Sequence, residues 1–398
     1  MSGDFEQAKS RVCQSEGAYV SVRPLASSWE QRKLGDCFEF LKNNTLSRAG
    51  LNGENGTARN VHYGDILIKF GDCLDGERSD LPFITDDTVL PKFAGSILRE
   101  GDVIFADTAE DEAAGKCVEL RKLPKEPTIS GLHTIPARPR FPFGTGYLGH
   151  YLNSDAYHRQ LLPLMQGIKV ISVSKAALQD TQVRFPGLSE QTAIGAALSE
   201  IDTLITLHQR KYDKLAQLKK SMLDKMFPKP GERFPEIRFA GFTDPWEQRK
   251  FSEIVDVCSG RDYKHLNEGP IPVYGTGGYM TSVCEALSHN RDAVGIGRKG
   301  TIDKPYLLKA PFWTVDTLFY AIPKPDINLE FALCSFLNVD WKSKDESTGL
   351  PSLSKEAINE TVLRVPNAVE QNHLGSFFTD LDSLITLHQR ESRFADTG

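Results

Sequence analysis

The chain has 398 residues, of which 40% are apolar and 25% are charged, and its formal net charge is −6. This composition is typical of a soluble globular protein with two or three domains, and it excludes a disordered or fibrous chain. The seven cysteines are scattered without a Cys-x-x-Cys pair, so we expect neither a disulfide framework nor a structural zinc site. No apolar run reaches the roughly 18 residues needed to cross a bilayer. The first ten residues also lack a secretion-signal pattern, so we expect a cytoplasmic protein with no membrane contact.

Charge is distributed unevenly along the chain. A net charge of −6 disfavours nucleic-acid binding, because domains that grip phosphate usually carry a positive balance. Between Thr206 and Pro230, however, seven lysines and arginines stand against two aspartates. The average therefore hides a locally basic segment, and DNA binding stays open.

The first mixed segment, or body, runs from about Leu34 to Ile171. Within it, Leu98 to Asp107 is predicted to be a turn that leads into a buried strand. His133, Arg138 and Arg140 follow near a later strand end. Such side chains either read DNA bases or stabilise turns, and the sequence leaves both alternatives open.

A long amphipathic helix is predicted from Gln191 to Met226, where apolar residues recur in alternating three- and four-residue steps. At roughly 1.5 Å per residue this helix would be about 54 Å long, more than one small core can cover. A second, shorter helix with the same seam is predicted from Gln371 to Phe394, so the two are expected to pair. The seam positions, which we also predict to bind partner proteins, are Ile201, Ile205, His208, Tyr212, Leu215, Leu381, Ile385 and His388.

The second body, from about Ser252 to Glu360, mixes short β-like runs with loops rich in glycine and proline. One loop, Tyr274 to Tyr279, places aromatic and hydroxyl groups on a flexible backbone, and another, Gly297 to Gly300, presents adjacent cations. Such loops suit close approach to a phosphate or a base edge. The predicted DNA-binding residues of this body are Tyr274, Thr276, Tyr279, Arg298, Lys299 and Lys304.

Matching loops end the two bodies. Gln166 to Lys169 and Ser347 to Leu350 each lead into a Ser-x-Ser-Lys motif. Short hydroxyl and lysine side chains at a loop-to-strand junction suit contacts with the phosphate backbone. We therefore add Lys169, Thr348 and Ser352 to the predicted DNA-binding residues.

The run Gly295 to Gly300 also satisfies the Gly-x-Gly-x-x-Gly pattern of dinucleotide-binding enzymes. Its context is wrong for that function. The preceding strand is very short, and Pro305 falls where the phosphate-capping helix should be running. Such an enzyme would have to bind nucleotide through the isolated second body.

An internal duplication organises the whole chain. Ser172 to Arg210 and Ser352 to Arg390 share 18 identities in 39 aligned positions, and both end in Leu-Ile-Thr-Leu-His-Gln-Arg. A second repeated motif, Trp-Glu-Gln-Arg-Lys, opens each unit at Trp29 and Trp246. The two bodies enclosed by these motifs show no evident sequence similarity. A long repeat present in two copies is unlike a solenoid, and it predicts two different heads on one common frame.

These repeated motifs resemble the specificity subunits of type I restriction–modification systems. The resemblance is carried by the Trp-Glu-x-Arg-Lys openings and by the Pro…Glu-Gln…Leu-Ile-x-x-His-Gln-Arg endings from Pro186 and Pro366. Further matches are Leu215–Pro228, Pro235–Phe239, Ile296–Thr301 and Phe312–Thr317. Together they cover nearly all of the chain.

The resemblance implies an α+β fold with two α/β target-recognition domains separated by two long antiparallel helices, a coiled-coil spacer with an internal pseudo-twofold repeat. The expected order is an N-terminal extension at 1–20, a first recognition domain at 21–171, the first repeat with the central helix at 172–232, a second recognition domain at 233–360, and the second repeat with the C-terminal helix at 361–398.

The resemblance further implies a non-catalytic subunit that binds a bipartite double-stranded DNA target and scaffolds two methyltransferase subunits and restriction subunits. Sequence motifs for adenine methylation and for ATP binding are absent, so S-adenosylmethionine, ATP and magnesium are expected on the partners and no cofactor on this chain. The alternative is a two-headed scaffold that binds proteins instead of DNA, which the negative net charge favours. We also consider that the repeated peptides mark segments where recognition domains are exchanged by recombination.

Overall fold

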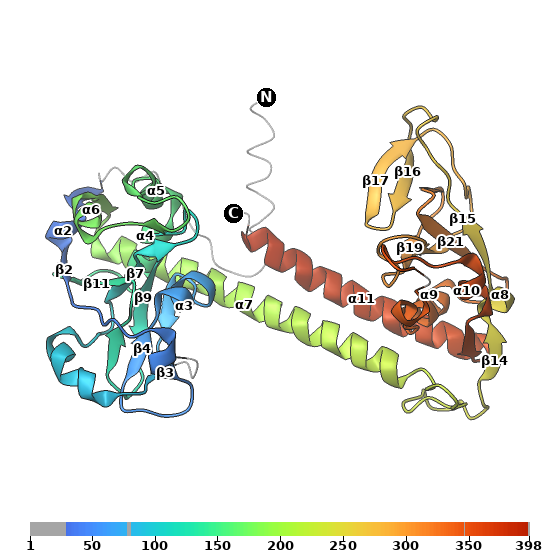
Figure 1. Cartoon of the computed structure of the whole chain (residues 1–398), viewed down its shortest axis with the longest axis horizontal. Coiled ribbons are helices and arrows are strands. Elements are labelled where there is room, and N and C mark those ends of the chain that lie inside the picture. Colours follow the sequence, from blue (N-terminus) through green and yellow to red (C-terminus); the bar gives the residue numbers. More distant parts are fainter. Residues whose placement is uncertain (1–28, 78–80, 346, 397–398) are drawn as a thin grey trace. The chain divides into compact units, whose positions relative to one another are not determined.

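The computed structural model describes residues 29–77, 81–345 and 347–396, and the chain divides into two compact units (Figure 1). The first unit extends to Thr203 and the second begins at Leu204. Helix α7, Leu188–Lys225, runs without interruption through this boundary. The predicted N-terminal extension, residues 1–20, lies outside the described ranges.

The first unit is built on a five-stranded sheet in the order β2-β11-β7-β9-β5. A four-stranded sheet, β10-β4-β6-β3, adjoins it. The strands of the two sheets are β2 (Phe38–Phe40), β3 (Leu51–Asn52), β4 (Arg59–Val61), β5 (Cys73–Asp75), β6 (Phe83–Ile84), β7 (Val103–Ala106), β9 (Cys117–Lys122), β10 (Thr128–Ser130) and β11 (Thr134–Pro139). The helices are α2 (Leu34–Cys37), α3 (Tyr63–Ile68), α4 (Tyr147–Asn153), α5 (Asp155–His158) and α6 (Lys175–Asp180).

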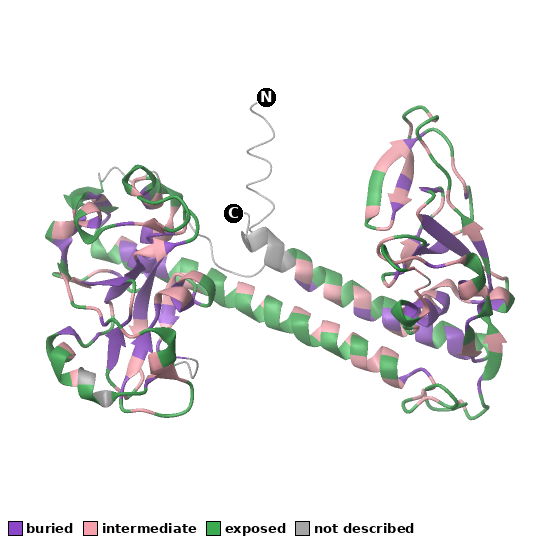
Figure 2. Cartoon of the chain, viewed as in Figure 1, coloured by how far each residue is buried: buried purple, intermediate pink, exposed green. Residues whose placement is uncertain are grey.

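The second unit has a four-stranded sheet, β15-β21-β18-β19, and a three-stranded sheet, β17-β16-β20. The strands are β15 (Val255–Ser259), β16 (Ile271–Gly275), β17 (Gly278–Val283), β18 (Ala293–Gly297), β19 (Tyr306–Leu308), β20 (Trp313–Thr314) and β21 (Leu318–Pro323). The helices are α8 (Phe251–Ile254), α9 (Leu329–Leu337), α10 (Lys355–Glu360) and α11 (Ala368–Asp396). In Figure 2 the buried colour runs through the strands of the bodies, which form their cores, whereas α7 is largely exposed.

The central sheets of the two units share one topology, although the bodies share no evident sequence. The order β2-β11-β7-β9 in the first unit corresponds to β15-β21-β18-β19 in the second. The registers agree as well, because Ala106 pairs with Thr134 at the end of β7, and Gly297 pairs with Leu318 at the end of β18. Apolar side chains fill these strands in both units, and burial of apolar area, rather than residue identity, is what a sheet core requires.

The repeated motifs close each unit in the same way. In the first unit the opening motif forms β1, Glu30–Lys33, which pairs antiparallel with β13, Gln182–Phe185. In the second unit β14, Glu247–Lys250, pairs in the equivalent register with β22, Val362–Val365. Two motifs that repeat at different sequence offsets are therefore partners in space.

The second unit contains an antiparallel helix pair. His208 on α7 contacts His388 on α11, with Nδ1 atoms 3.0 Å apart, and further along α7 Lys219 binds Asp382 at 2.6 Å. The first of these contacts joins equivalent residues of the identical heptapeptides. The α+β class, the long helices and the internal repeat are thus confirmed. In the described part of the chain, none of the helices combines the length and the apolar character that crossing a bilayer requires.

Candidate nucleic-acid interface

The predicted DNA-binding residues of the second unit gather at one end of its central sheet, which we call the strand-end edge. Arg298 directly follows β18, and its N–H donates to the carbonyl of Thr317, which precedes β21, at 2.8 Å. The Arg298 carbonyl accepts from the N–H of Leu353 at 2.9 Å. The backbones of Lys299 and Ser352 also form an isolated antiparallel β-bridge. Segments far apart in the sequence therefore meet here.

The hairpin of β16 and β17 continues this edge. The Tyr274 carbonyl accepts a hydrogen bond from the N–H of Val315 at 3.0 Å, and Val315 lies two residues before Thr317. Tyr279 is 64% exposed on the hairpin, and Thr276 lies in its turn. Exposed Lys304 follows the turn after β18. Each of the residues predicted in this body therefore lies on the strand-end edge or on the loops that adjoin it.

Glycines at the end of β18 make a tight turn and not a nucleotide-binding loop. A Cβ on Gly297 would come within 2.0 Å of the Thr301 carbonyl, and Gly300 has a φ of +88° that favours glycine. The chain then continues into β19, with no helix between β18 and β19. The phosphate-capping helix that a dinucleotide site requires is thus missing between Gly297 and Tyr306.

A carboxylate holds the loop before α10 in place. Asp345 Oδ1 accepts from the N–H groups of Ser347 and Ser352 at 3.0 and 2.9 Å. These backbone hydrogen bonds, that from Ser352 first, hold the pKa of Asp345 below its usual value. Ser352 is therefore fixed through its backbone, while Thr348 at the tip of the loop is exposed.

The first unit has an equivalent strand-end edge. Asp107 directly follows β7, its N–H donates to the carbonyl of His133 at 3.0 Å, and its own carbonyl accepts from the N–H of Val173 at 2.8 Å. Strand β12, Ile171–Ser172, pairs with β8, Thr108–Ala109, and brings the loop that carries exposed Lys169 to the same edge. His133 and Lys169, which the sequence named separately, therefore lie at the same edge of the sheet.

Arg138 and Arg140 lie at the other end of β11. The Arg138 guanidinium donates to both oxygens of Asp102, at 2.9 and 2.7 Å, and only 16% of its side chain is exposed. Arg140 is exposed and donates to the carbonyl of Phe38 at 3.2 Å. Arg138 is thus held by Asp102, as the structural alternative expects, whereas Arg140 stays exposed. Both arginines lie at the opposite end of β11 from His133.

The sequence did not single out Asp107 or Tyr63. Asp107 Oδ1 lies 3.3 Å from His133 Nδ1, and the Tyr63 ring meets the His133 ring edge-on at 5.3 Å. His133 has a φ of +55°, which makes it the one residue besides glycine with a positive φ among those described. The sequence did contain one signal for Asp107, since it directly follows a predicted buried strand and functional side chains often lie on the loops at strand ends.

The predicted partner-binding residues lie along α7 and α11. Ile201 is 47% exposed, whereas Leu381 and His388 are buried within the second unit. The remaining positions are intermediate in exposure: Ile205, His208, Tyr212, Leu215 and Ile385. Comparably exposed apolar side chains occur on the two identical heptapeptides, at Leu204, Leu207, Leu384 and Leu387, with 46% to 54% of each accessible. These four were not in the predicted set.

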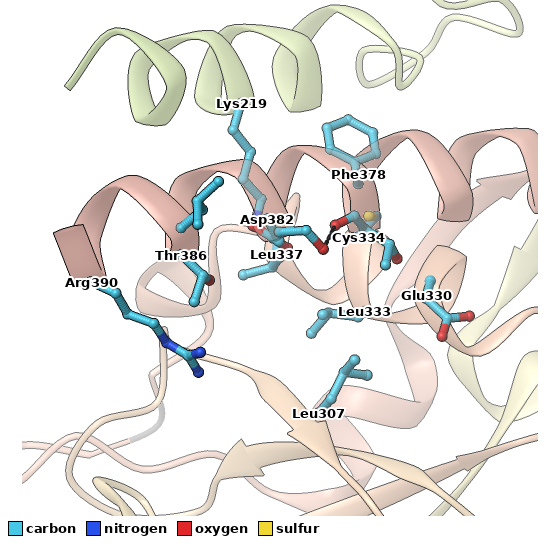
Figure 3. Close-up of a pocket in the computed structure, with 13 residues that line it drawn as sticks. Lys219, Leu307, Glu330, Leu333, Cys334, Leu337, Phe378, Asp382, Thr386 and Arg390 are labelled. Atoms are coloured by element: carbon cyan, nitrogen blue, oxygen red, sulfur yellow. Dashed lines mark hydrogen bonds and ion pairs between the residues drawn. The ribbon is translucent and has the colours of Figure 1, made fainter. Parts of the chain in front are cut away.

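A cavity of about 430 Å³ lies beside the helix pair of the second unit (Figure 3). Leu307, Leu333 and Leu337 line it from the body, and Lys219 reaches across from α7 to Asp382 on α11. Among the described residues, no group of three or more histidine, cysteine, aspartate or glutamate side chains is arranged to hold a metal ion. We assign no chemistry to this cavity.

These observations define an internally duplicated α/β protein whose polar side chains gather at the same edge of both central sheets. The family described as "Type I restriction modification DNA specificity domain" matches residues 243–393. Those residues are similar to that family, and the resemblance of the chain to specificity subunits is confirmed.

Two curated relatives come from Methanocaldococcus jannaschii. The type I restriction enzyme MjaVIII specificity subunit is 29% identical over 103 residues, which are 25% of this chain and 24% of that protein. The putative type I restriction enzyme MjaX specificity subunit is 22% identical over 264 residues, or 63% of this chain and 59% of that protein. The matched parts span less than two thirds of either relative.

Solved structures share the fold. The S subunit of a type I restriction–modification system from M. genitalium has a TM-score of 0.60 at 16% identity, covering 94% of this chain and 95% of that one. A chain from a study of complex assembly and conformational transition of the type I R-M system has a TM-score of 0.52 at 15% identity, covering 94% and 96%.

Proposed function

We propose that this chain is the DNA-specificity subunit of a type I restriction–modification complex, and that each strand-end edge binds one half of a bipartite DNA target. The observation that carries the proposal is the duplicated edge itself. In both units the residue after a central strand, the residue before its neighbour and a loop from the repeat meet through equivalent backbone hydrogen bonds. A rigid sheet that presents variable side chains on loops is the usual way to position recognition residues.

The side chains at these edges suit two kinds of contact. Lysines and hydroxyls on loops, such as Lys169, Lys299 and Thr348, would bind phosphates and fix the register on the duplex. Side chains held at strand ends would read base edges in the major groove. The predicted domain limits follow from this division: 21–171 and 233–360 would be the recognition domains, and 172–232 and 361–398 the frame.

The frame would also bind partner subunits. The identical heptapeptides expose Leu204, Leu207, Leu384 and Leu387, so two copies of one methyltransferase subunit could use the same contacts, and restriction subunits would join that assembly. Catalysis, with S-adenosylmethionine, ATP and magnesium, would then belong to the partners and not to this chain. Such a complex would act in the cytoplasm, where host DNA is methylated.

Methylome sequencing of a host that carries the complete system tests the proposal. We expect one methylated motif with two short specified halves and a fixed unspecified gap between them. A single contiguous motif, or no methylation that depends on this chain, would rule the proposal out.

A salt series separates the proposal from the protein-binding scaffold. If phosphates are contacted, the affinity of the purified complex for duplex DNA falls linearly on a log–log plot against salt, with a slope of about −0.9 per contacted phosphate. DNA affinity that does not change with salt would favour the scaffold that binds proteins instead.

A further inference from the structure

The two strand-end edges place chemically opposite side chains at the same position. Asp107 and Arg298 each directly follow the equivalent central strand. Each donates its N–H to the residue before the neighbouring strand, His133 or Thr317, and each accepts from the N–H of the residue before the repeated serine, Val173 or Leu353. These matched bonds make Asp107 and Arg298 structural counterparts, although their side chains carry opposite charges.

The Arg298 guanidinium has two neighbouring N–H donors available for a ligand. Its side chain is exposed, and Nη1 donates to the Asp316 carbonyl at a long 3.3 Å. Within the described ranges Nε and Nη2 make no hydrogen bond. Two adjacent N–H donors on a planar group match the O6 and N7 acceptors of guanine, which is the commonest specific contact in the major groove.

Asp107 instead has one carboxylate oxygen, Oδ2, available as a hydrogen-bond acceptor. Thr108 Oγ1 donates to Asp107 Oδ1 at 2.7 Å, and His133 Nδ1 lies 3.3 Å from the same oxygen. Oδ2 accepts from no side chain or backbone group of the described residues, and 26% of the Asp107 side chain is exposed. A carboxylate oriented in this way accepts from an exocyclic amino group, such as N4 of cytosine.

The backbone supports a recognition role for the first of these sites. His133 holds a positive φ that costs free energy for a residue with a Cβ, and such conformations cluster at functional sites. The imidazole, 47% exposed, lies against both Asp107 and the Tyr63 ring. Asp107 is thus held by its neighbours before any ligand arrives.

We propose that Asp107 and Arg298 are specificity-determining residues, and that they give the two half-sites opposite chemistry at one equivalent position. Arg298 selects a guanine in the half-site read by the second unit. Asp107, oriented by His133, selects a cytosine or adenine amino group in the half-site read by the first unit. This inference rests on the proposed function.

The test compares methylomes of hosts that express the complete system with wild-type chain, Arg298→Ala, Arg298→Lys or Asp107→Asn. Arg298→Ala and Arg298→Lys should each relax one base position of one half-site, with discrimination there falling about 5- to 150-fold, because lysine keeps the charge but loses the fork. Asp107→Asn should relax one position of the other half. Lys309→Ala, which removes a paired surface cation at the opposite end of β18, serves as the matched control and should leave the motif unchanged.

The outcomes separate the inference from the function beneath it. A wild-type motif that is not bipartite defeats the proposed function. If the wild-type motif is bipartite but the half-site read by the second unit contains only A·T pairs, Arg298 has no guanine to select, so the inference fails and the proposed function stands. A motif that is unchanged in every variant has the same consequence. Uniformly weaker methylation in Arg298→Ala with full activity in Arg298→Lys would make Arg298 a phosphate contact and also overturn the inference. Co-purification of each variant with the methyltransferase subunit checks that a loss of methylation is not a loss of folding.

Discussion

The two junctions between body and long helix use the same repeated residues but bury them differently. In the second unit Trp246 is 2% exposed, and its Nε1–H donates to Glu370 at 3.3 Å. Glu370 also binds the Arg238 guanidinium through both oxygens, each at 2.7 Å. In the first unit the counterpart Trp29 is 41% exposed and Glu190 is half-buried.

The difference comes from a segment that the repeat does not include. After α7 the link from Phe227 to Phe242 packs on both the opening motif and α11. Phe227 meets the Trp246 ring edge-on at 5.6 Å, and Phe239 contacts Phe377 on α11. The repeated segments therefore form the same backbone pairing, as β1–β13 and β14–β22 show, but they are not buried to the same extent. Burial depends on what the rest of the chain brings to the junction.

The largest effect is expected from Glu370→Ala. This change leaves the Arg238 guanidinium, 13% exposed, without its counter-charge, and breaking a buried ion pair from one side costs about 3–5 kcal/mol. Glu190→Ala at the equivalent position should cost less than about 1 kcal/mol, because Glu190 is only half-buried and makes no ion pair among the described residues. Urea denaturation of the full chain, followed by tryptophan fluorescence, measures both. Equal losses of unfolding free energy would contradict the contrast between the junctions.

Glycines on the long helices should rank next. A Cβ on Gly195 would lie 2.3 Å from the carbonyl of Thr145, whereas one on Gly375 would first meet the Asn328 side chain at 2.5 Å. Backbone cannot yield as a side chain can, so Gly195→Ala should cost about 2–3 kcal/mol and Gly375→Ala about 1–2 kcal/mol. Thermal unfolding of the two variants, beside a matched Ala→Gly change at exposed Ala196, tests the order, and the reverse order would refute it.

The paired glutamines should behave alike in both units. Gln191 accepts from the N–H of Gly144 and donates to the carbonyl of Pro186, and Gln371 makes the same bonds with Asn328 and Pro366. Removing either amide leaves two backbone groups unpaired inside the protein, so each change to alanine should cost about 1–3 kcal/mol. Chemical denaturation should give losses that agree within roughly 0.5 kcal/mol, the usual limit of additivity. A clear inequality would mean that the frame is not equivalent in the two units.

The features that could be predicted from the sequence are those that local residue patterns determine. The helices predicted at 191–226 and 371–394 are observed at Leu188–Lys225 and Ala368–Asp396, because periodic apolar residues and the prolines after Phe227 are local signals. The shared central sheet was not predicted, because many different apolar sequences can form the same buried strands and the two bodies therefore need not look alike. Arg138 shows the limit for sites, because its pairing with Asp102 spans 36 residues and leaves no local pattern. Asp107 was missed as a contact for the same reason, although the strand that it ends was predicted.

The smallest effect is expected at an aspartate that both repeats carry. Asp382 binds Lys219 at 2.6 Å (Figure 3), whereas its counterpart Asp202 lies 3.6 Å from His150, and burial raises the pKa of Asp202. A raised pKa means that folding disfavours the ionised form, so the contribution of Asp202 to stability falls as the pH rises through its pKa. At neutral pH Asp202→Asn should therefore stabilise slightly and Asp382→Asn should destabilise slightly, each by less than about 1 kcal/mol.

Denaturation at neutral and at acid pH measures this opposition. In acid Asp202 is protonated in the folded and in the unfolded chain, so Asp202→Asn should approach the wild-type stability. Added salt should reduce the effect of Asp382→Asn, because Asp382 is 44% exposed and its attraction to Lys219 is screened. Effects of the same sign at neutral pH would show that the neighbours of the repeated aspartate, which differ between the units, do not set its contribution.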